Sequence, residues 1–280
     1  MTAALPMPTW LLFLAALLTA PPVIAQSERV STCGDEVENL LRKALAAHAD
    51  TRRAASGTRL QLDCVAVPGD ANGSVHALGS FRDDATRSYN DGGDGEGYAF
   101  VLATLDAGNR LRHHVTATAI QDATTLFVGG EFTLDTGFHD LAPGGGVVGV
   151  AVTSAAPGAS APDNRWRDEF ALFVPDGTRF RRVLGLARQT EESIEGCVSG
   201  WCTGSRWTET TATLTPGELG AEGWRRIEIR LDVAEIAIEP AVARTAPTST
   251  TATLAYANGE YRLPDGGAVP GSGYFFLLPW

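Results

Sequence analysis

Short runs of alternating apolar and polar residues, separated by glycine, proline and aspartate turns, constrain this chain more than any other feature. Residues 59–67 read RLQLDCVAV, the pattern of a half-buried strand. Residues 98–105 and 111–120 flank a turn at 106–109, as in a β-hairpin. Further strands are expected at 147–152, 169–174, 180–186, 208–214, 224–239, 251–257 and 260–263. The sequence therefore predicts a mainly β fold, an antiparallel β-sandwich or barrel.

Two segments depart from simple alternation. Apolar residues recur at helical spacing over 35–55, which predicts one N-terminal helix. In the long run 224–239, Ile227 to Val233 share one face, whereas Ile236 and Ile238 continue on the opposite parity. This change of phase predicts a bulge or bend near Ala234.

The first 25 residues have the features of an export signal. WLLFLAALL at 10–18 is an apolar run of signal-peptide length, followed by Pro21 and Pro22. Val23-Ile24-Ala25 then suits cleavage before Gln26. We expect a signal peptide over 1–25, a helical segment over 26–56 and a β-rich domain over 57–280. The predicted location is periplasmic or secreted, with no membrane span after cleavage.

A stretch of small residues and prolines at 155–163, AAPGASAPD, raises an alternative organisation. Such a composition is typical of a linker or a long loop. The β-rich domain could accordingly be two β lobes that meet near 155–165.

The chain is acidic, with 33 Asp and Glu against 22 Lys and Arg and a formal net charge of −11. An acidic surface repels polyanions, so nucleic acid and anionic membrane surfaces are not expected partners.

The four cysteines predict disulfides in an exported chain, and three connectivities are open. We favour Cys33–Cys64, which ties the N-terminal segment to the first strand, and Cys197–Cys202, which closes a short loop containing Gly200. The spacing does not follow the CxxC pattern of zinc or redox sites.

Residues 141–186 carry a resemblance. The succession DLAPGGGVVGVAV and EFALFVPDGTRFRRVLGL resembles a segment of uncharacterised exported bacterial proteins. The resemblance covers about a sixth of the chain. It implies a secreted β-rich protein and no particular activity.

Leu134-Asp135-Thr136-Gly137 is the clearest enzyme motif. Aspartic peptidases place the catalytic aspartate in such a D-T-G turn, so that two carboxylates share one proton. The chain has no second D-T-G or D-S-G, so an active site centred on Asp135 would require a homodimer. Phe138 also stands where those enzymes have a small residue.

An acidic glycine loop at 90–97 is the best candidate for a cation site. Asp91, Asp94 and Glu96 offer oxygen ligands, and the glycines permit a tight backbone. The loop does not match the EF-hand pattern; no cofactor is expected, and calcium at this loop is the alternative. A solvated turn explains the loop without a metal.

The histidines do not form a metal motif. Adjacent His113 and His114 point to opposite faces of a strand, so they cannot together chelate one ion. A transition-metal site would need His76 or His139 brought in by the fold.

Four tryptophans in the C-terminal half fall in or next to turns and strand starts: Trp166, Trp201, Trp207 and Trp224. Exposed tryptophans bind sugar faces and protein hot spots. We take Trp166, Trp201 and Trp207 as candidate ligand contacts; the alternative is that the tryptophans fill the edges of a sandwich.

The sequence therefore favours an exported, non-catalytic binding or envelope protein whose partner is a protein or a glycan. The alternatives are a dimeric aspartic peptidase centred on Asp135 and a calcium-dependent glycan-binding module.

Overall fold

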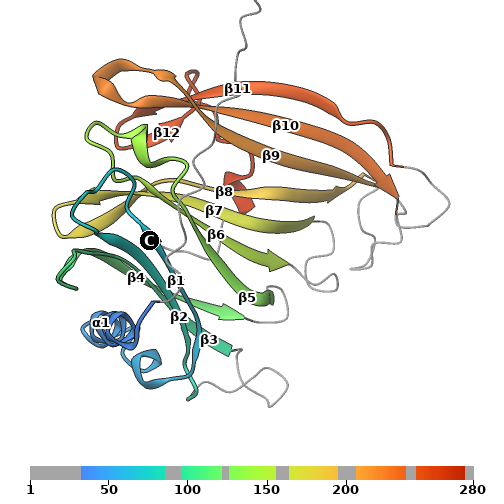
Figure 1. Ribbon diagram of the computed structural model, residues 1–280. Coiled ribbons are helices and arrows are strands. Elements are labelled where there is room, and N and C mark those ends of the chain that lie inside the picture. The colour runs from blue at the N-terminus through green and yellow to red at the C-terminus, as the bar shows by residue number, and fades with distance from the viewer. Residues whose placement is uncertain are drawn as a thin grey trace, which may run out of the picture.

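A computed structural model describes residues 33–85, 96–121, 126–155, 164–194, 206–237 and 244–274. It confirms the expected class: mainly β, with one α-helix near the N-terminus of the described chain (Figure 1). The helix is α1 (Asp35–Ala46). The strands are β1 (Arg59–Ala66), β2 (Val75–Arg82), β3 (Glu96–Leu105), β4 (Leu111–Gln121), β5 (Leu126–Asp135), β6 (Val148–Ala155), β7 (Asn164–Asp176), β8 (Arg179–Ser193), β9 (Arg206–Leu219), β10 (Arg225–Ala237), β11 (Thr248–Ala257) and β12 (Glu260–Arg262).

The helix is shorter than the expected 35–55. It ends at Ala46, and the hydroxyl of Thr51 donates to the Leu45 carbonyl oxygen at 2.7 Å. The same carbonyl oxygen accepts the His48 N–H at 3.2 Å, so a side chain and a turn bond together occupy a carbonyl at the end of the helix. A separate 3₁₀ turn, η1 (Ala54–Ser56), follows.

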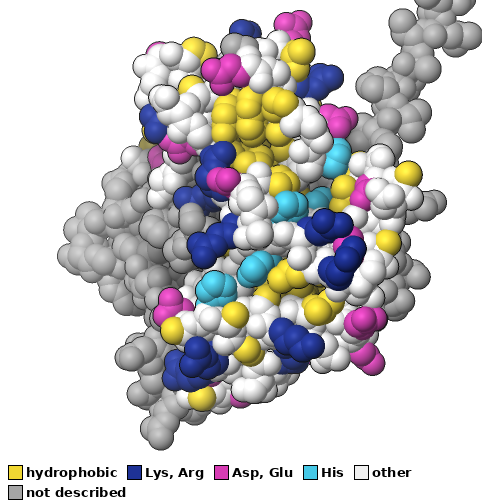
Figure 2. All heavy atoms as spheres, turned by 90° about the vertical axis from the view of Figure 1, so that its left-hand side faces the viewer, with side chains coloured by type: hydrophobic (Ala, Val, Ile, Leu, Met, Phe, Trp, Pro, Cys, Tyr) yellow, Lys and Arg dark blue, Asp and Glu magenta, His cyan; other side chains and the backbone are white. Residues whose placement is uncertain are grey.

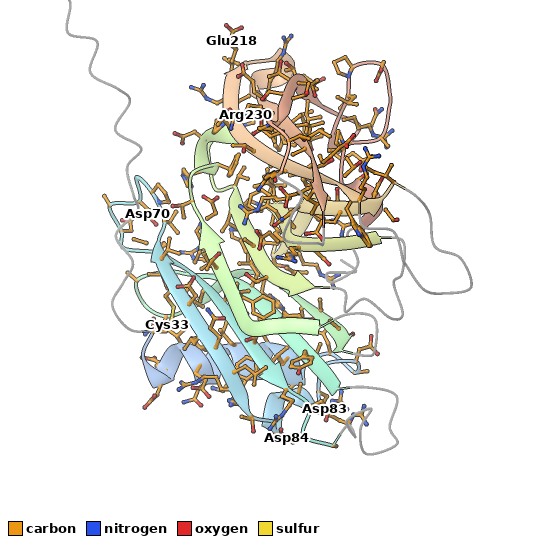
Figure 3. All side chains as sticks on the ribbon, turned by 90° about the vertical axis from the view of Figure 1, so that its right-hand side faces the viewer. Cys33, Asp70, Asp83, Asp84, Glu218 and Arg230 are labelled. Atoms are coloured by element: carbon orange, nitrogen blue, oxygen red, sulfur yellow. A yellow bond between two sulfur atoms is a disulfide. The ribbon has the colours of Figure 1, made fainter. Side chains whose placement is uncertain are left out.

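The apolar stripe of α1 covers the outer face of β1 to β3. Leu41 and Leu45 are fully buried, together with Phe81 and Val101 from the strands. The Cys33–Cys64 disulfide joins the start of this segment to β1, as predicted. Figure 3 shows Cys33 beside α1, with Arg230 of β10 at the opposite end of the molecule. Cys197 and Cys202 lie outside the described residues.

Strands β1 to β8 enclose the first apolar core. The ladder runs β1-β2-β3-β4-β8, and β5, β6 and β7 form a branch in which β7 pairs with β8. All eight strands contribute side chains to one cluster between them: Val65, Leu78, Tyr98, Phe100, Leu102, Ala117, Ala119, Phe132, Leu134, Val148, Val150, Val152, Ala171, Phe173 and Phe180. This half of the molecule is therefore barrel-like.

Two irregular seams close the barrel-like half. On one side, β4 meets β8 in parallel through the single pair His114–Arg179. On the other, the side chain of Gln61 in β1 makes both hydrogen bonds to the Phe132 backbone of β5: its amide donates to the carbonyl at 2.6 Å, and its oxygen accepts from the N–H at 2.7 Å. Asp63 accepts from the Leu134 N–H at 3.0 Å. Side chains thus replace ladder bonds at this seam.

Strands β9 to β12 extend the sheet from β8 and form a second layer. A second core packs between this layer and the outer side of β6 to β8: Phe138, Leu141, Val147, Ala151, Phe170, Leu172, Val174, Val183, Leu184, Leu186, Ala212, Ile227, Ile229, Leu254, Tyr261 and Val269. The layers in Figure 1 follow from this packing, because each strand of β9 to β11 offers one apolar face.

The register of β10 corrects one expectation. Its pairing with β9 is continuous from Ile227 to Ala237, so no bulge lies near Ala234; the register shift lies between Arg225 and Ile227. Ala234 is nevertheless buried and Glu235 exposed. The apolar residues therefore switch from odd to even positions because the other face of the strand becomes buried, while the strand itself stays unbroken.

The two asparagine turns have the backbone conformation that their residues favour. Asn109, after β3, and Asn258, after β11, have positive φ values of 55° and 52°, which asparagine tolerates well.

The strands on either side of 156–163, β6 and β7, pair with each other in one sheet. Among the described residues, no helix is long and apolar enough to span a membrane.

Candidate ligand-binding pocket

The tryptophans expected to contact a ligand do not form a site in the described part of the chain. Trp207, in β9, is only 1% exposed, and a buried indole cannot stack on a ligand. Trp207 is therefore no longer a candidate ligand contact. Its burial agrees with the alternative that the tryptophans fill the sandwich. Trp166 belongs to β7, but its side chain lies outside the described residues, as does Trp201.

The acidic glycine loop remains a prediction. Asp91 and Asp94 lie outside the described residues, and Glu96 is placed only by its backbone, which pairs with Gln121 at the start of β3. Within the described ranges, no group of three His, Cys, Asp or Glu residues is placed to hold a metal ion.

Asp135 ends β5 and starts a tight turn. Its carboxylate accepts the Gly137 N–H at 2.8 Å, and it lines a cavity of about 280 Å³ that also contains Asp168 and Arg188. Gly149, opposite Asp135 in β6, is required there because a Cβ would collide with Asp135 and Phe170. The D-T-G motif thus has a structural role in a turn, and a second carboxylate of the same chain lies at the same cavity.

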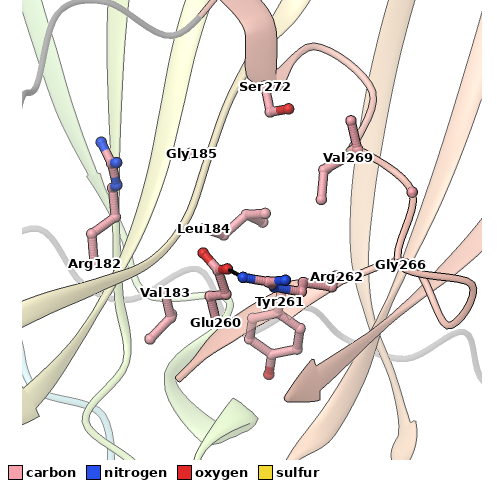
Figure 4. Close-up of a pocket in the computed structure, with 12 residues that line it drawn as sticks. Arg182, Val183, Leu184, Gly185, Glu260, Tyr261, Arg262, Gly266, Val269 and Ser272 are labelled. Atoms are coloured by element: carbon pink, nitrogen blue, oxygen red, sulfur yellow. Dashed lines mark hydrogen bonds and ion pairs between the residues drawn. The ribbon is translucent and has the colours of Figure 1, made fainter. Parts of the chain in front are cut away.

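Another cavity lies elsewhere. It measures about 410 Å³ and is bounded by β8, β12 and the loop that follows β12 (Figure 4). We call it the β8–β12 pocket: Arg182, Val183, Leu184, Gly185, Glu260, Tyr261, Arg262, Gly266, Gly267, Ala268, Val269 and Ser272.

A bulge in β8 shapes one wall of this pocket. Phe173 pairs with Arg182 and Leu172 pairs with Leu184, so Val183 is an extra residue in the ladder. Val183 and Leu184 therefore both belong to the second core, and neighbouring residues of one strand face the same side. The bulge aligns four consecutive β8 residues along the pocket.

The loop after β12 forms the opposite wall and is fixed to β8. The Ala187 N–H donates to the Gly271 carbonyl oxygen at 3.0 Å. Gly271 has a φ of +80°, and a Cβ there would collide with the Ala187 carbonyl oxygen. Only glycine allows this close approach without strain.

The polar groups of the pocket are of both signs. Glu260 and Arg262 form an ion pair on β12, and Figure 4 shows their side chains directed toward each other. Partial burial lowers the pKa of the Arg182 guanidinium, and the charge of Glu260 opposes this shift. The floor is apolar, because Leu184, Tyr261 and Val269 are buried. A carboxylate and two guanidinium groups thus surround an apolar base.

Aromatic residues support β12 from behind. Trp224 and Tyr256 stack with ring centroids 3.5 Å apart, and Tyr261 contacts both rings edge-on. The Tyr261 hydroxyl donates to the Arg225 carbonyl oxygen at 2.8 Å, and burial raises the pKa of this phenol. Arg181 donates to the Tyr256 hydroxyl at 2.9 Å. The wall that carries Glu260 and Arg262 is therefore held rigidly.

All five histidines lie at the end of the molecule where β4 meets β8. The rings of His48 and His114 are 6.0 Å apart, and those of His76 and His113 lie 6.2 and 5.8 Å from the Phe180 ring. His139 is close enough to His76 to help lower its pKa. Figure 2 shows the histidines gathered among arginines on this face. The fold does bring His76 and His139 near His113, which sequence spacing alone did not reveal.

Lining residues are shared between neighbouring cavities from the β8–β12 pocket to this histidine face. One of about 390 Å³ shares Arg182 with the pocket. It shares Val115 and Arg179 with a further cleft beside His48 and His114.

No known protein family, curated protein or solved structure matches this chain.

Proposed function

We propose that this protein is an exported, non-catalytic binding protein that holds a saccharide unit of a glycan in the β8–β12 pocket. The observation that carries the proposal is the presence, at one cavity of about 410 Å³, of a carboxylate and two guanidinium groups contributed by β8 and β12. Sites for small ligands span roughly 300–1,000 Å³ and combine apolar walls with a few fixed polar groups.

The chemistry of the lining favours hydroxyl groups as ligand. Glu260 only accepts hydrogen bonds, whereas Arg182 and Arg262 only donate them. A sugar hydroxyl does both, so adjacent hydroxyls can bridge a carboxylate and a guanidinium. Export is supported by the apolar N-terminal run and the Cys33–Cys64 disulfide.

The test begins with a glycan array probed with the mature chain, followed by calorimetry on each glycan retained. We expect Glu260→Gln and Arg262→Gln each to weaken binding about tenfold, the effect of losing one charge-assisted hydrogen bond. Glu228→Gln is the matched control, because Glu228 lies exposed on the outer face of β10. An empty array, or equal affinities for all four proteins, would contradict the proposal.

A second candidate, an aspartic peptidase, is favoured by one observation: Asp135 and Asp168 line the same cavity. This arrangement would supply both carboxylates from one chain, without the homodimer expected from the single D-T-G. Casein cleavage that is lost in Asp135→Asn and in Asp168→Asn would support it. Cleavage that persists in both variants, or is absent in the wild type, would exclude it.

A further inference from the structure

The cleft beside the two outer histidines is built from three separate elements. The segment after α1 contributes His48, Asp50 and Thr51, and β4 contributes His114 to Thr118. Arg179 of β8 completes the lining of a cavity of about 280 Å³. We call it the α1–β4 cleft.

Three donor groups in this cleft have no partner among the described residues. The guanidinium of Arg179 makes no hydrogen bond or ion pair with another described side chain, and the rings of His48 and His114 make no hydrogen bond there. This is unusual in a chain where most described arginines pair with a carboxylate. A guanidinium and two imidazoles at one cavity, free of other described side-chain partners, can donate together to an anionic ligand.

The position of Arg179 is fixed by the seam between β4 and β8. Its backbone pairs with that of His114, and the His114 N–H donates to the Thr178 carbonyl oxygen at 3.2 Å. The same seam therefore brings an arginine and a histidine to one place. The hydroxyl-bearing Thr116 and Thr118 follow along β4.

We propose that the α1–β4 cleft binds a tetrahedral oxyanion, the phosphate or sulfate group of a larger ligand or the free ion. Arg179, His48 and His114 supply donors from three elements, and a tetrahedral anion accepts from several directions at once. This site is independent of the saccharide proposal for the β8–β12 pocket.

The charges around the cleft make its affinity depend on pH. Burial lowers the pKa of His114, and the charges of His48 and Arg179 lower it further. Asp50 is the one carboxylate among the residues that line the cleft, and it opposes anion binding. A bound anion favours the protonated form of His114, so binding should strengthen as the pH falls toward the lowered pKa of His114.

The experiment is calorimetric titration with sodium sulfate at constant ionic strength, since sulfate keeps its charge between pH 5.5 and 8. We expect saturable binding that is about tenfold tighter at pH 5.5 than at pH 8, because a protonated histidine adds one attractive charge pair with the anion. Inorganic phosphate and glucose 6-phosphate, titrated in parallel, distinguish a free ion from an ester as the preferred form; acetate and chloride should show no saturable binding.

Variants locate the site. Arg179→Gln should weaken sulfate binding about tenfold, and Asp50→Asn should strengthen it. The double variant His48→Gln/His114→Gln should remove the difference between the two pH values. Arg226→Gln is the matched control, because Arg226 is exposed on β10 and pairs with no described residue.

Three results would overturn the proposal. They are equal binding by the wild type and Arg179→Gln, equal weakening in Arg226→Gln, and no saturable binding at pH 5.5. Because Arg179 is exposed and unpaired, this substitution should leave the melting temperature unchanged, which confirms that the variant is folded.

Discussion

His76 is the residue whose environment departs furthest from that of a histidine in water. It is 1% exposed, inside the barrel-like half, where its Nδ1 lies 3.0 Å from the Thr104 hydroxyl and its Nε2 has no hydrogen-bond partner among the described residues. Burial, with smaller contributions from the charges of His139 and His113, lowers its pKa from 6.5 to about 4. The folded protein therefore holds His76 neutral.

This shift predicts how stability depends on pH. The unfolded chain binds a proton at His76 below pH 6.5, whereas the folded chain does so only below about 4. Stability is thus full above pH 6.5, falls as the pH drops from 6.5 to about 4, and loses about 3 kcal/mol from this group in total. Urea denaturation at pH 7.5 and pH 4 should show a smaller loss in His76→Gln, which cannot titrate.

His48→Gln is the control for that measurement, since His48 lies on the outer side of the barrel-like half and shows no such burial. Denaturation curves of the wild type and His76→Gln that fall in parallel with pH would contradict the assigned state of His76.

At the scale of single elements, most strands could be predicted because each carries its own alternation. Strand β1 begins at Arg59, and β3 and β4 flank a turn with the expected asparagine. The expected helix was too long because the apolar residues at helical spacing end near His48, and the Thr51 hydroxyl binds the Leu45 carbonyl oxygen beyond the end of the helix. The apolar pattern of the sequence does not show that a side-chain hydroxyl will bind a backbone carbonyl oxygen at the end of the helix.

The seam between β1 and β5 could not be predicted, because its strands are joined by side chains far apart in sequence. Gln61 satisfies both backbone groups of Phe132. Gln61→Met should therefore destabilise the fold by about 1–3 kcal/mol, the cost of leaving partly buried backbone groups without partners. Denaturant midpoints provide the measurement.

Asp63→Asn is the matched variant at the same seam. The amide oxygen of asparagine can still accept the Leu134 N–H, so we expect a change within about 0.5 kcal/mol. If Gln61→Met were as stable as Asp63→Asn, the seam would not depend on these side-chain bonds.

At the scale of the whole molecule, the candidate pocket depends on contacts between distant parts of the sequence. Arg182 and Glu260 lie far apart in the chain, and the fold brings them to one cavity through the β8 bulge and the β11–β12 hairpin. The strands at 251–257 and 260–263 could be predicted from the sequence, but the strand that they would face could not. From the sequence, tryptophans near turns were expected to be exposed and to contact a ligand, but Trp207 is buried in the structure.

The histidines are also brought together only by contacts between distant parts of the sequence. Their spacing along the chain suggests no common site, and only the meeting of β4 with β8 gathers all five at one end. Although the chain as a whole is acidic, its histidines lie beside arginines on one face (Figure 2).

Hydrogen exchange with and without a glycan selected on the array tests directly whether the β8–β12 pocket binds the saccharide. Ligand in the β8–β12 pocket should slow exchange at 182–185 and 260–272, the segments that line it, and leave the outer face of β10 unchanged. Protection confined to other segments, such as residues 195–205 around Trp201, would place the ligand elsewhere and contradict the account.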